Sequence, residues 1–497
     1  MSERAVSAPL FRDEELSAAL SSNALLANLL KEQRRLDTAV TRFSEWHESD
    51  ASPSMARHYR HLIPTTQPQS GEQYAFEVNL DECTGCKACV TACHSLNGLD
   101  ENESWRSVGA IISPSGIGYQ QTITSACHHC EDPACANGCP VLAYEKDAIT
   151  GIVKHLDDQC IGCSYCILKC PYDVPKLNVR LGIVRKCDMC SARLAEGEAP
   201  ACVQACPSGA ISIGIHRRST EADVTPLLPG LVRGDYTRPT TTYISSRSRP
   251  TEAHSSEAMV LRVEPTHWPL VLMLLLTQIS TGLFLATLFT PDSRLLWIAN
   301  GALNTGLIAS VLHLGQPLRA WRCFLGWRKS WLSREIVVFG MFAAAGGAAL
   351  LSAIPAWLAA GAGALGVFCS IMVYVDTQRP DWRVSRTTLA FGGTCAVAFS
   401  SALSIYNTTL VWIPALVIMI KAVGISSPWF RDRQGYTSLM HFKALPGWSF
   451  GYLIASALAI PLLWINPFSA TVAALTGEVL ERALFFKTVR AWRMPIV

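Results

Sequence analysis

Sixteen cysteines between residues 83 and 206 constrain the fold of this 497-residue chain more than any other feature of its sequence. They fall into four groups of four with short internal spacings. The groups are Cys83, Cys86, Cys89 and Cys93; Cys127, Cys130, Cys135 and Cys139; Cys160, Cys163, Cys166 and Cys170; and Cys187, Cys190, Cys202 and Cys206. A domain so rich in cysteine is organised around whatever its thiols bridge or bind.

Disulfide bonds are one explanation for many cysteines, but they are typical of short secreted chains that carry an export signal. The first residues, MSERAVSAPLFRDEEL, contain neither the apolar stretch nor the twin arginine of such a signal. We therefore expect the cysteines to be reduced, and groups of reduced cysteines bind metal.

The spacing of the cysteines indicates which metal group they bind. Groups one and three follow the pattern C-x2-C-x2-C-x3-C, and a proline follows the last cysteine of groups two, three and four. In this pattern three thiolates hold one iron–sulfur cubane and the fourth reaches a neighbouring cluster. Structural zinc would instead use two separated C-x2-C pairs. The sixteen cysteines thus predict four [4Fe–4S] clusters, which form a path for single electrons.

The second half of the chain is apolar. Only 16% of all residues are charged, against about 25% in soluble proteins, and most charges lie before residue 266. Eight apolar segments follow, most of them close to the roughly 20 residues that cross a bilayer. They lie at about residues 267–290, 295–314, 335–353, 355–375, 387–406, 409–426, 448–465 and 468–486. Because buried helices of a soluble protein rarely occur eight in succession, we predict eight transmembrane helices.

Arginine and lysine mark one face of this membrane region. They occupy the connections after the second, fourth and sixth segments and the tail, whereas the opposite connections contain only Arg294. The residues are Arg319, Arg322, Arg328, Lys329, Arg334, Arg379, Arg383, Arg386, Arg431, Arg433, Lys443, Lys487, Arg490 and Arg493. The positive-inside rule then places the cysteine-rich region and the C-terminus on the cytoplasmic side of an inner membrane. A net charge of +3 without basic runs gives no indication of nucleic-acid binding.

These features divide the chain into five parts. We predict a helical extension at 1–48, a linker at 49–73, the four-cluster domain at 74–216, a polar connector at 217–258 and the membrane-anchor domain at 259–497. Strand-like pieces such as YAFEVNL and GAISIGI accompany the cysteine loops. The predicted fold class is an α+β ferredoxin-like tandem 4Fe–4S domain followed by an all-α bundle of eight transmembrane helices.

Ionisable side chains inside a membrane are costly, so each one in the apolar half is a candidate for function. His313 ends the second segment, where it could bond a quinone oxygen or simply a loop carbonyl. Glu478 and Arg482 form an i,i+4 pair in the last segment, near Glu481. Two roles remain equally open for these residues, a structural ion pair and a proton exit for quinol. Lys421 is expected to snorkel towards the cluster-bearing face. No haem is expected, because His313 is the only histidine well inside a predicted span.

Residues 74–215 resemble the four-cluster ferredoxin-type subunit of the dimethyl sulfoxide reductase family of molybdopterin oxidoreductases, and residues 267–497 resemble its membrane-anchor subunit. The anchor likeness lies in HWPLVLMLLLTQISTG, HLGQPLRAWR, WLSRE and LERALFF. The resemblance implies a quinone site at His313 and pairing of cysteine group one with four and two with three. The implied ligand sets are Cys83, Cys86, Cys89 and Cys206 (cluster I); Cys93, Cys187, Cys190 and Cys202 (cluster II); Cys127, Cys130, Cys135 and Cys170 (cluster III); and Cys139, Cys160, Cys163 and Cys166 (cluster IV, nearest the membrane).

The sequence therefore predicts the electron-transfer and membrane-anchor subunits of a quinone-linked molybdopterin oxidoreductase, joined in one chain. A separate catalytic subunit would carry the molybdenum cofactor, and menaquinone or ubiquinone would exchange electrons with the clusters from the lipid membrane. The resemblance allows the whole complex to be either a sulfoxide or N-oxide reductase or a sulfite or formate dehydrogenase. The chain itself has no catalytic triad, P-loop or dinucleotide-binding fingerprint. A redox adaptor for a non-molybdenum partner and a proton pump remain as alternatives.

Overall fold

The computed structural model describes residues 28–29, 31, 56–113, 118–218, 235–248, 250, 253–256, 260–290, 292–431, 435–490 and 494. It divides into a unit of residues 1–61 and a unit of residues 62–497. The helical extension predicted at 1–48 lies almost entirely outside the described residues. Within the predicted linker, the chain forms helix α4 (Ala56–Tyr59) and the helical turn η1 (Arg60–Leu62).

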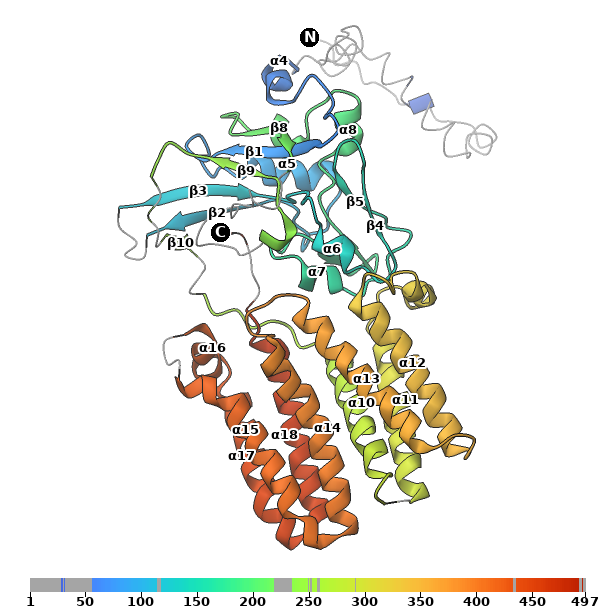
Figure 1. The fold of residues 1–497 in the computed structure, drawn as a ribbon. Coiled ribbons are helices and arrows are strands. Elements are labelled where there is room, and N and C mark those ends of the chain that lie inside the picture. Colours follow the sequence, from blue (N-terminus) through green and yellow to red (C-terminus); the bar gives the residue numbers. More distant parts are fainter. Residues whose placement is uncertain are drawn as a thin grey trace, which may run out of the picture. The chain divides into compact units, whose positions relative to one another are not determined.

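The cysteine-rich domain contains two three-stranded sheets (Figure 1). The first has the order β8-β1-β9 and the second the order β10-β2-β3, and only β1 and β9 pair in parallel. The strands are β1 (Glu72–Asn79), β8 (Ile211–Arg217), β9 (Thr242–Ile244), β10 (His254–Ser255), β2 (Ser107–Ile112) and β3 (Gln120–Ser125). The strand-like pieces predicted from the sequence are β1 and β8. They pair because alternate apolar residues meet across the strands, as Phe76 does with Ile213.

The connector predicted at 217–258 supplies part of this domain. Its strand β9 extends the first sheet beside β1, where Leu80 N donates to Ile244 O at 2.8 Å. Its strand β10 extends the second sheet beside β2. Both strands are only two or three residues long and largely polar, so no hydrophobic alternation reveals them in the sequence. Backbone hydrogen bonds at the sheet edges hold them in place.

Short helices and two hairpins carry the cysteine loops. The helices are α5 (Ala88–Leu96), α6 (Ala134–Asn137), α7 (Tyr165–Lys169), α8 (Ser191–Ala195) and α9 (Ala201–Gln204), and the turn η3 spans Asp235–Thr237. The hairpins are β4 (Tyr144–Lys146) with β5 (Val153–His155) and β6 (Lys176–Asn178) with β7 (Ile183–Arg185). Such small elements suit a domain in which metal binding, more than secondary structure, fixes the loops.

Eight long helices follow. They are α10 (Trp268–Ala286), α11 (Ser293–Leu312), α12 (Trp331–Leu350), α13 (Ala356–Val375), α14 (Val384–Tyr406), α15 (Trp412–Arg431), α17 (Pro446–Ile465) and α18 (Pro467–Lys487). The connections contain η4 (Pro317–Phe324), η5 (Thr408–Leu410), α16 (Tyr436–Leu439) and the π-helical turn η6 (Met440–Ala444). Among the described residues, all of these long helices except α18 are long and apolar enough to cross a membrane, which makes seven candidate spans. The eighth span stays a prediction, because Glu478, Glu481 and Arg482 make α18 more polar.

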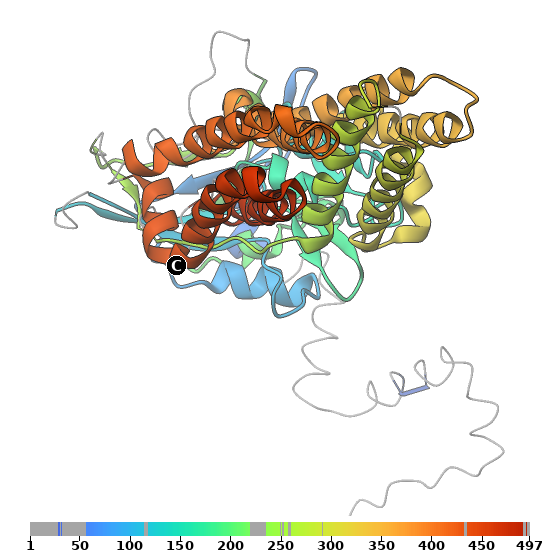
Figure 2. The ribbon, with the colours of Figure 1, turned by 90° about the horizontal axis from the view of Figure 1, so that it is seen from below.

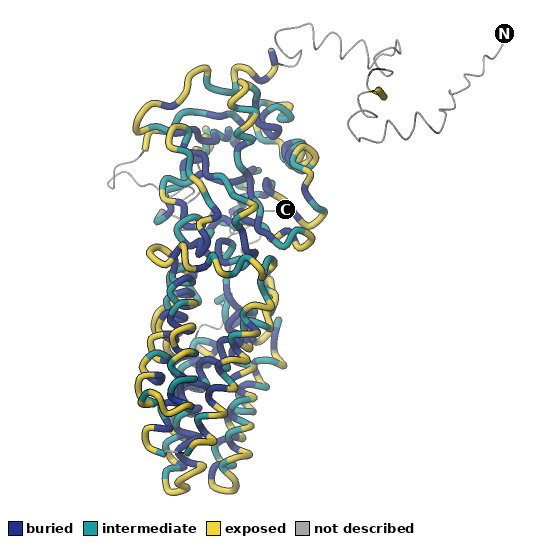
Figure 3. The backbone as a smooth tube through the Cα atoms, turned by 90° about the vertical axis from the view of Figure 1, so that its right-hand side faces the viewer, coloured by how far each residue is buried: buried dark blue, intermediate teal, exposed yellow. Residues whose placement is uncertain are grey.

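Helix α10 is central to the helix packing. It packs against α11, α13, α14 and α18, so it joins the group α10–α13 to the group formed by α14, α15, α17 and α18 (Figure 2). Exposed residues recur along the helices of both groups (Figure 3). Many of these are large and apolar, such as Trp297, Ile308 and Leu458. An outward apolar surface of this extent matches contact with lipid.

Candidate functional site

Three of the implied ligand sets converge around small hollows in the cysteine-rich domain. One hollow is lined by Cys83, Cys86, Cys89 and Cys206, one by Cys127, Cys130, Cys135 and Cys170, and one by Cys139, Cys160, Cys163 and Cys166. These are the sets of clusters I, III and IV. The cysteines of cluster II are also close to one another, since Cys93 interacts electrostatically with Cys190 and Cys202, and Cys187 with Cys93 and Cys202. Helices α5 and α9, which carry Cys93 and Cys202, pack together.

The chemistry of these sites fits iron–sulfur clusters. Burial raises the pKa of the Cys93 thiol to about 12 and that of Cys170 to about 11. A buried thiol of this kind stays protonated at neutral pH unless a metal supplies positive charge, and a cluster does so. In the part of the chain that the structure describes, no group of three His, Cys, Asp or Glu side chains is arranged for a single metal ion.

Backbone N–H groups already point at several sulfur atoms. Ala143 N donates to Cys139 Sγ at 3.2 Å, and Gly162 N and Val184 N donate to Cys160 Sγ at 3.4 and 3.5 Å. Burial would raise the pKa of Cys160, but hydrogen bonds from His155 and from these backbone groups outweigh it and lower the pKa. Hydrogen bonds to sulfur of this kind tune the reduction potential of a bound cluster.

Residues 157–168, which carry Cys160, Cys163 and Cys166, form the cluster-IV loop. A cavity of about 630 Å³ lies where this loop meets the membrane helices. Its walls come from residues 161–168, from α10, α11, α12 and α13, and from η4 with the residues just before it, and they are mostly apolar. Cys163 lines both this cavity and the hollow of cluster IV. The cavity therefore has the size and apolar character of a small-molecule site and adjoins a proposed electron carrier.

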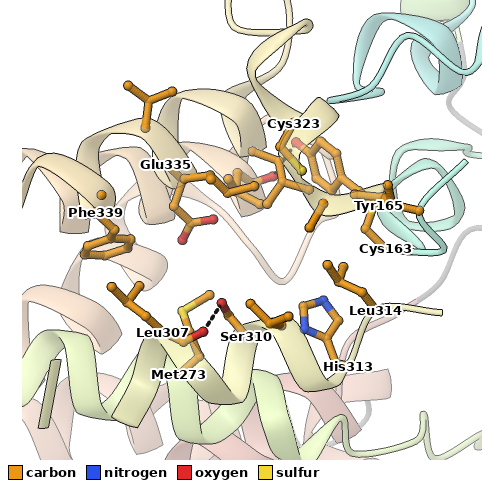
Figure 4. A pocket seen from close by; sticks show the side chains of 18 of the residues that line it. Cys163, Tyr165, Met273, Leu307, Ser310, His313, Leu314, Cys323, Glu335 and Phe339 are labelled. Atoms are coloured by element: carbon orange, nitrogen blue, oxygen red, sulfur yellow. Dashed lines mark hydrogen bonds between the residues drawn. The ribbon is translucent and has the colours of Figure 1, made fainter. Parts of the chain in front are cut away.

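Two ionisable side chains lie on opposite sides of this cavity (Figure 4). His313 follows the last turn of α11, and its ring approaches the Ser310 carbonyl. Among the residues that the structure describes, none forms a well-formed hydrogen bond with its buried Nδ1 atom. Glu335, in the first turns of α12, is 3% exposed and accepts a hydrogen bond from the Ser370 hydroxyl. The two groups give the cavity a polar atom at each side.

The cluster domain and the membrane helices make direct contacts around the cavity. The Tyr165 hydroxyl donates to Val373 O at 2.9 Å, and Lys169 forms a 2.8 Å ion pair with Asp376. Gln316, three residues after His313, donates from its backbone N to Ile161 O at 3.0 Å. These contacts fix the cluster-IV loop over the ends of α11 and α13.

The other predicted quinone residues, Glu478 and Arg482, do not line the cavity as the structure describes it. They belong to a buried network between α10, α14, α15 and α18. Glu478 pairs with Lys421, and Arg482 Nη2 donates to Gln278 Oε1 at 3.0 Å and lies 3.5 Å from Glu481. The expectation that Lys421 snorkels to the membrane face is wrong, because its ammonium group is buried against Glu478.

Thiol sets suited to iron–sulfur clusters and a series of long apolar helices, both in one chain, define an iron–sulfur electron-transfer protein with its own membrane anchor. Comparison with known families agrees. Residues 119–216 match the 4Fe–4S dicluster domain, and residues 264–427 match the DMSO reductase anchor subunit (DmsC). The protein belongs to the dimethyl sulfoxide reductase family of iron–sulfur subunits, here joined to the anchor subunit. It is a multi-pass membrane protein.

The sequences of individual relatives match the cluster domain of this chain. The chain is 36% identical over 194 residues to the probable anaerobic dimethyl sulfoxide reductase chain YnfG of Escherichia coli (strain K12), across 36% of this chain and 92% of the relative. It is 37% identical over 191 residues to the B subunit of anaerobic dimethyl sulfoxide reductase from the same strain, with the same coverage. The iron–sulfur subunit of the nitrate-inducible formate dehydrogenase of that strain is 34% identical over 178 residues, across 31% of this chain and 60% of the relative.

Glu335 is the main cavity residue that the sequence reasoning missed. It stands at the start of the third apolar segment, and a carboxylate at such a position is itself a signal of function in a membrane protein. Tyr165 gives no comparable signal, since it lies inside cysteine group three and faces the cavity only through the fold.

Proposed function

We propose that this chain carries electrons between a quinone in the membrane and a separate molybdopterin catalytic subunit. The observation that carries the proposal is the shared position of Cys163, which lines both the cluster-IV hollow and the apolar cavity. A quinone in the cavity would lie next to the first carrier, so no haem is needed between them.

The sixteen cysteines would hold four [4Fe–4S] clusters in the sets I–IV defined above. The donor chemistry supports this assignment, since each set consists mainly of buried or half-buried thiols. Bound there, the clusters would supply one-electron carriers from cluster IV beside the cavity to cluster I, whose ligand Cys86 is exposed. A catalytic subunit that docks near cluster I would complete the path.

His313 and Glu335 would handle the protons of the quinone. A quinol releases two protons and two electrons, whereas an iron–sulfur cluster accepts one electron at a time. The Nδ1 atom of His313, which has no well-formed hydrogen bond among the described residues, suits one quinone oxygen, and the Glu335 carboxylate suits a proton on the opposite side. Menaquinone and ubiquinone both fit this chemistry.

Different observations support the proposed orientation and the proposed partner. Basic loop residues, among them Arg319 and Arg322, lie on the same side as the cluster domain and bond its backbone, so the positive-inside rule supports a cytoplasmic cluster domain. Relatives named as subunits of dimethyl sulfoxide reductase and of formate dehydrogenase support a molybdopterin partner.

The test is made on the full chain purified in mild detergent. His313→Ala should weaken binding of a fluorescent alkyl-hydroxyquinoline N-oxide about tenfold, because one hydrogen bond to the ring is lost. Glu335→Gln should leave binding intact but slow quinol-driven cluster reduction about 100-fold, because a proton acceptor is lost.

The matched controls are His61→Ala, an exposed histidine of the turn η1, and Glu481→Gln, a buried carboxylate outside the cavity. Equal effects of Glu335→Gln and Glu481→Gln would contradict the cavity assignment. About sixteen irons per chain without a co-purifying pterin protein would favour the redox-adaptor alternative.

A further inference from the structure

Two buried cations lie among the cysteine sets with no carboxylate at ion-pair distance among the described residues, whereas the buried Lys169 pairs with Asp376. Arg106, next to the start of β2, is 2% exposed, and Lys186, next to Cys187, is 3% exposed. Burying a cationic side chain is costly unless its surroundings supply negative charge or acceptors. The surroundings of these two residues therefore indicate their role.

Lys186 lies between the sets of clusters II and III. Its ammonium donates to Cys187 O at 2.7 Å and to Val153 O, and it reaches Cys127 Sγ at 3.5 Å. Cys187 belongs to cluster II and Cys127 to cluster III. Cys135 of cluster III also acts on this lysine, and His129 lies close to it as well.

Arg106 lies between the sets of clusters I and II. Its Nη1 donates to Thr124 Oγ1 at 3.2 Å, and that hydroxyl lies 3.6 Å from Cys89 Sγ of cluster I. Cys93, Cys187 and Cys202 of cluster II also lie close to its guanidinium, as does His128. The Nε and Nη2 atoms are buried and have no hydrogen-bond partner among the described residues. Sulfur atoms of two bound clusters would supply the missing acceptors.

The third gap, between clusters III and IV, contains a different residue. The buried hydroxyl of Tyr144 lies near Cys135 of cluster III and near Cys139 and Cys166 of cluster IV. It carries no fixed charge. The gaps along the predicted path thus contain a guanidinium, an ammonium and a neutral hydroxyl in turn.

We propose that Arg106 and Lys186 are positioning charges that raise the reduction potentials of the two clusters each one separates. Reduction adds a negative charge to a cluster, and a nearby cation stabilises that charge strongly inside a protein. Cluster II receives both contributions, clusters I and III receive one each, and cluster IV receives neither. The two charges therefore favour an electron on clusters I–III over cluster IV beside the cavity. The inference rests on the four ligand sets of the proposed function.

The test is a redox titration of the purified full chain, followed by EPR. The signals are assigned first with Cys89→Ser, Cys202→Ser, Cys127→Ser and Cys163→Ser, one variant for each cluster. Lys186→Met should then shift clusters II and III to lower potential and leave I and IV in place. Arg106→Met should lower I and II and leave III and IV in place.

Conservative variants separate charge from structure. Lys186→Arg and Arg106→Lys keep the charge and should restore the potentials. Where Lys186→Met loses iron, Lys186→Gln gives the same comparison, since its amide still donates to the two carbonyls. The control is Lys154→Met, a half-buried lysine whose charge acts on Asp147, and it should shift no cluster.

The outcomes distinguish this inference from the function on which it rests. Far fewer than sixteen irons in the unaltered chain would overturn the four-cluster assignment itself. Sixteen irons with equal shifts in all four clusters, or with no shift in the methionine variants, would overturn only the role of Arg106 and Lys186.

Discussion

Three glycines allow the cluster domain to approach the membrane helices at the cavity. Gly162 and Gly182 have φ values of +68° and +64°, which favour glycine, and both lie against Gly315. A Cβ atom on Gly315 would overlap the carbonyl oxygen of Gly182. Gly315 belongs to the same HLG motif as His313, so one short sequence provides both the close approach and the cavity histidine.

Gly315→Ala should push the cluster-IV loop away from the cavity. The atoms that the added Cβ would meet are backbone atoms of Gly182, which cannot rotate aside. We expect the iron content to stay near that of the unaltered chain. Quinol-driven cluster reduction should slow at least about tenfold, because electron transfer needs the quinone and the cluster to be held close together. Stopped-flow absorbance measures the rate. Gly301→Ala in α11 is the control, since no described atom lies within 4 Å of its added Cβ. Equal rates in the two variants would contradict this role.

The connecting elements of the membrane domain serve two purposes. Basic residues around η4 are typical of a cytoplasmic loop, and this is how the sequence alone explains them. In the structure Arg319 donates to Asp157 O and Cys160 O at 3.0 and 3.1 Å, and Arg322 donates to Asp158 O at 2.7 Å. The same arginines that indicate topology therefore also bind the cluster-IV loop.

Among the long helices, α15 and α18 are joined by buried charge. Lys421→Met should destabilise the protein by about 3–5 kcal/mol, because it leaves Glu478 buried without its partner. Thermal unfolding in detergent measures the loss. The double variant Lys421→Met/Glu478→Met should recover most of it, since an apolar pair of similar volume replaces both charges. A double variant as unstable as the single one would show that the pair is not the cause.

How much of this structure the sequence predicts depends on how local each signal is. Long apolar runs predict the helices α10–α15, α17 and α18, and cysteine spacing predicts the metal group, because both signals lie within one segment. The cavity is different, since it requires Cys163, His313 and Glu335 from three separate elements. The partner of Lys421 is likewise invisible until α15 and α18 pack together. The strands β9 and β10 are too short and polar to be recognised before β1 and β2 pair with them.

At the scale of the whole molecule, one chain contains a lipid-facing helical domain, a cavity and a series of thiol sets. Cys163 is the point at which the cavity and the thiol sets meet. Electron transfer through the molecule should therefore depend on this junction more than on any single set farther away.

Cys163→Ser should disable cluster IV alone. We expect the iron content to fall from about sixteen to about twelve to fifteen per chain, depending on whether the cluster is lost or converted. Clusters I–III should still be reduced by dithionite but no longer by quinol. EPR after each reductant makes the comparison. Cys395→Ser, a buried cysteine of α14 outside the ligand sets, is the control. Quinol-driven reduction that survives the loss of the cluster-IV signal would refute the proposed path.

The edge strands of the connector have a consequence for biosynthesis. The two three-stranded sheets of the cluster domain are completed only by β9 and β10. Residues 256–267 alone separate β10 from the first membrane helix. During translation, which proceeds from the N-terminus, the ribosome therefore delivers the last strand and α10 almost together. The sixteen cysteines of the four sets all precede β9, so every thiol of these sets is synthesised before the two sheets are complete and before the first membrane helix. Two separate subunits could be made in either order, whereas this fused chain fixes one order of synthesis for the thiol sets and the membrane helices.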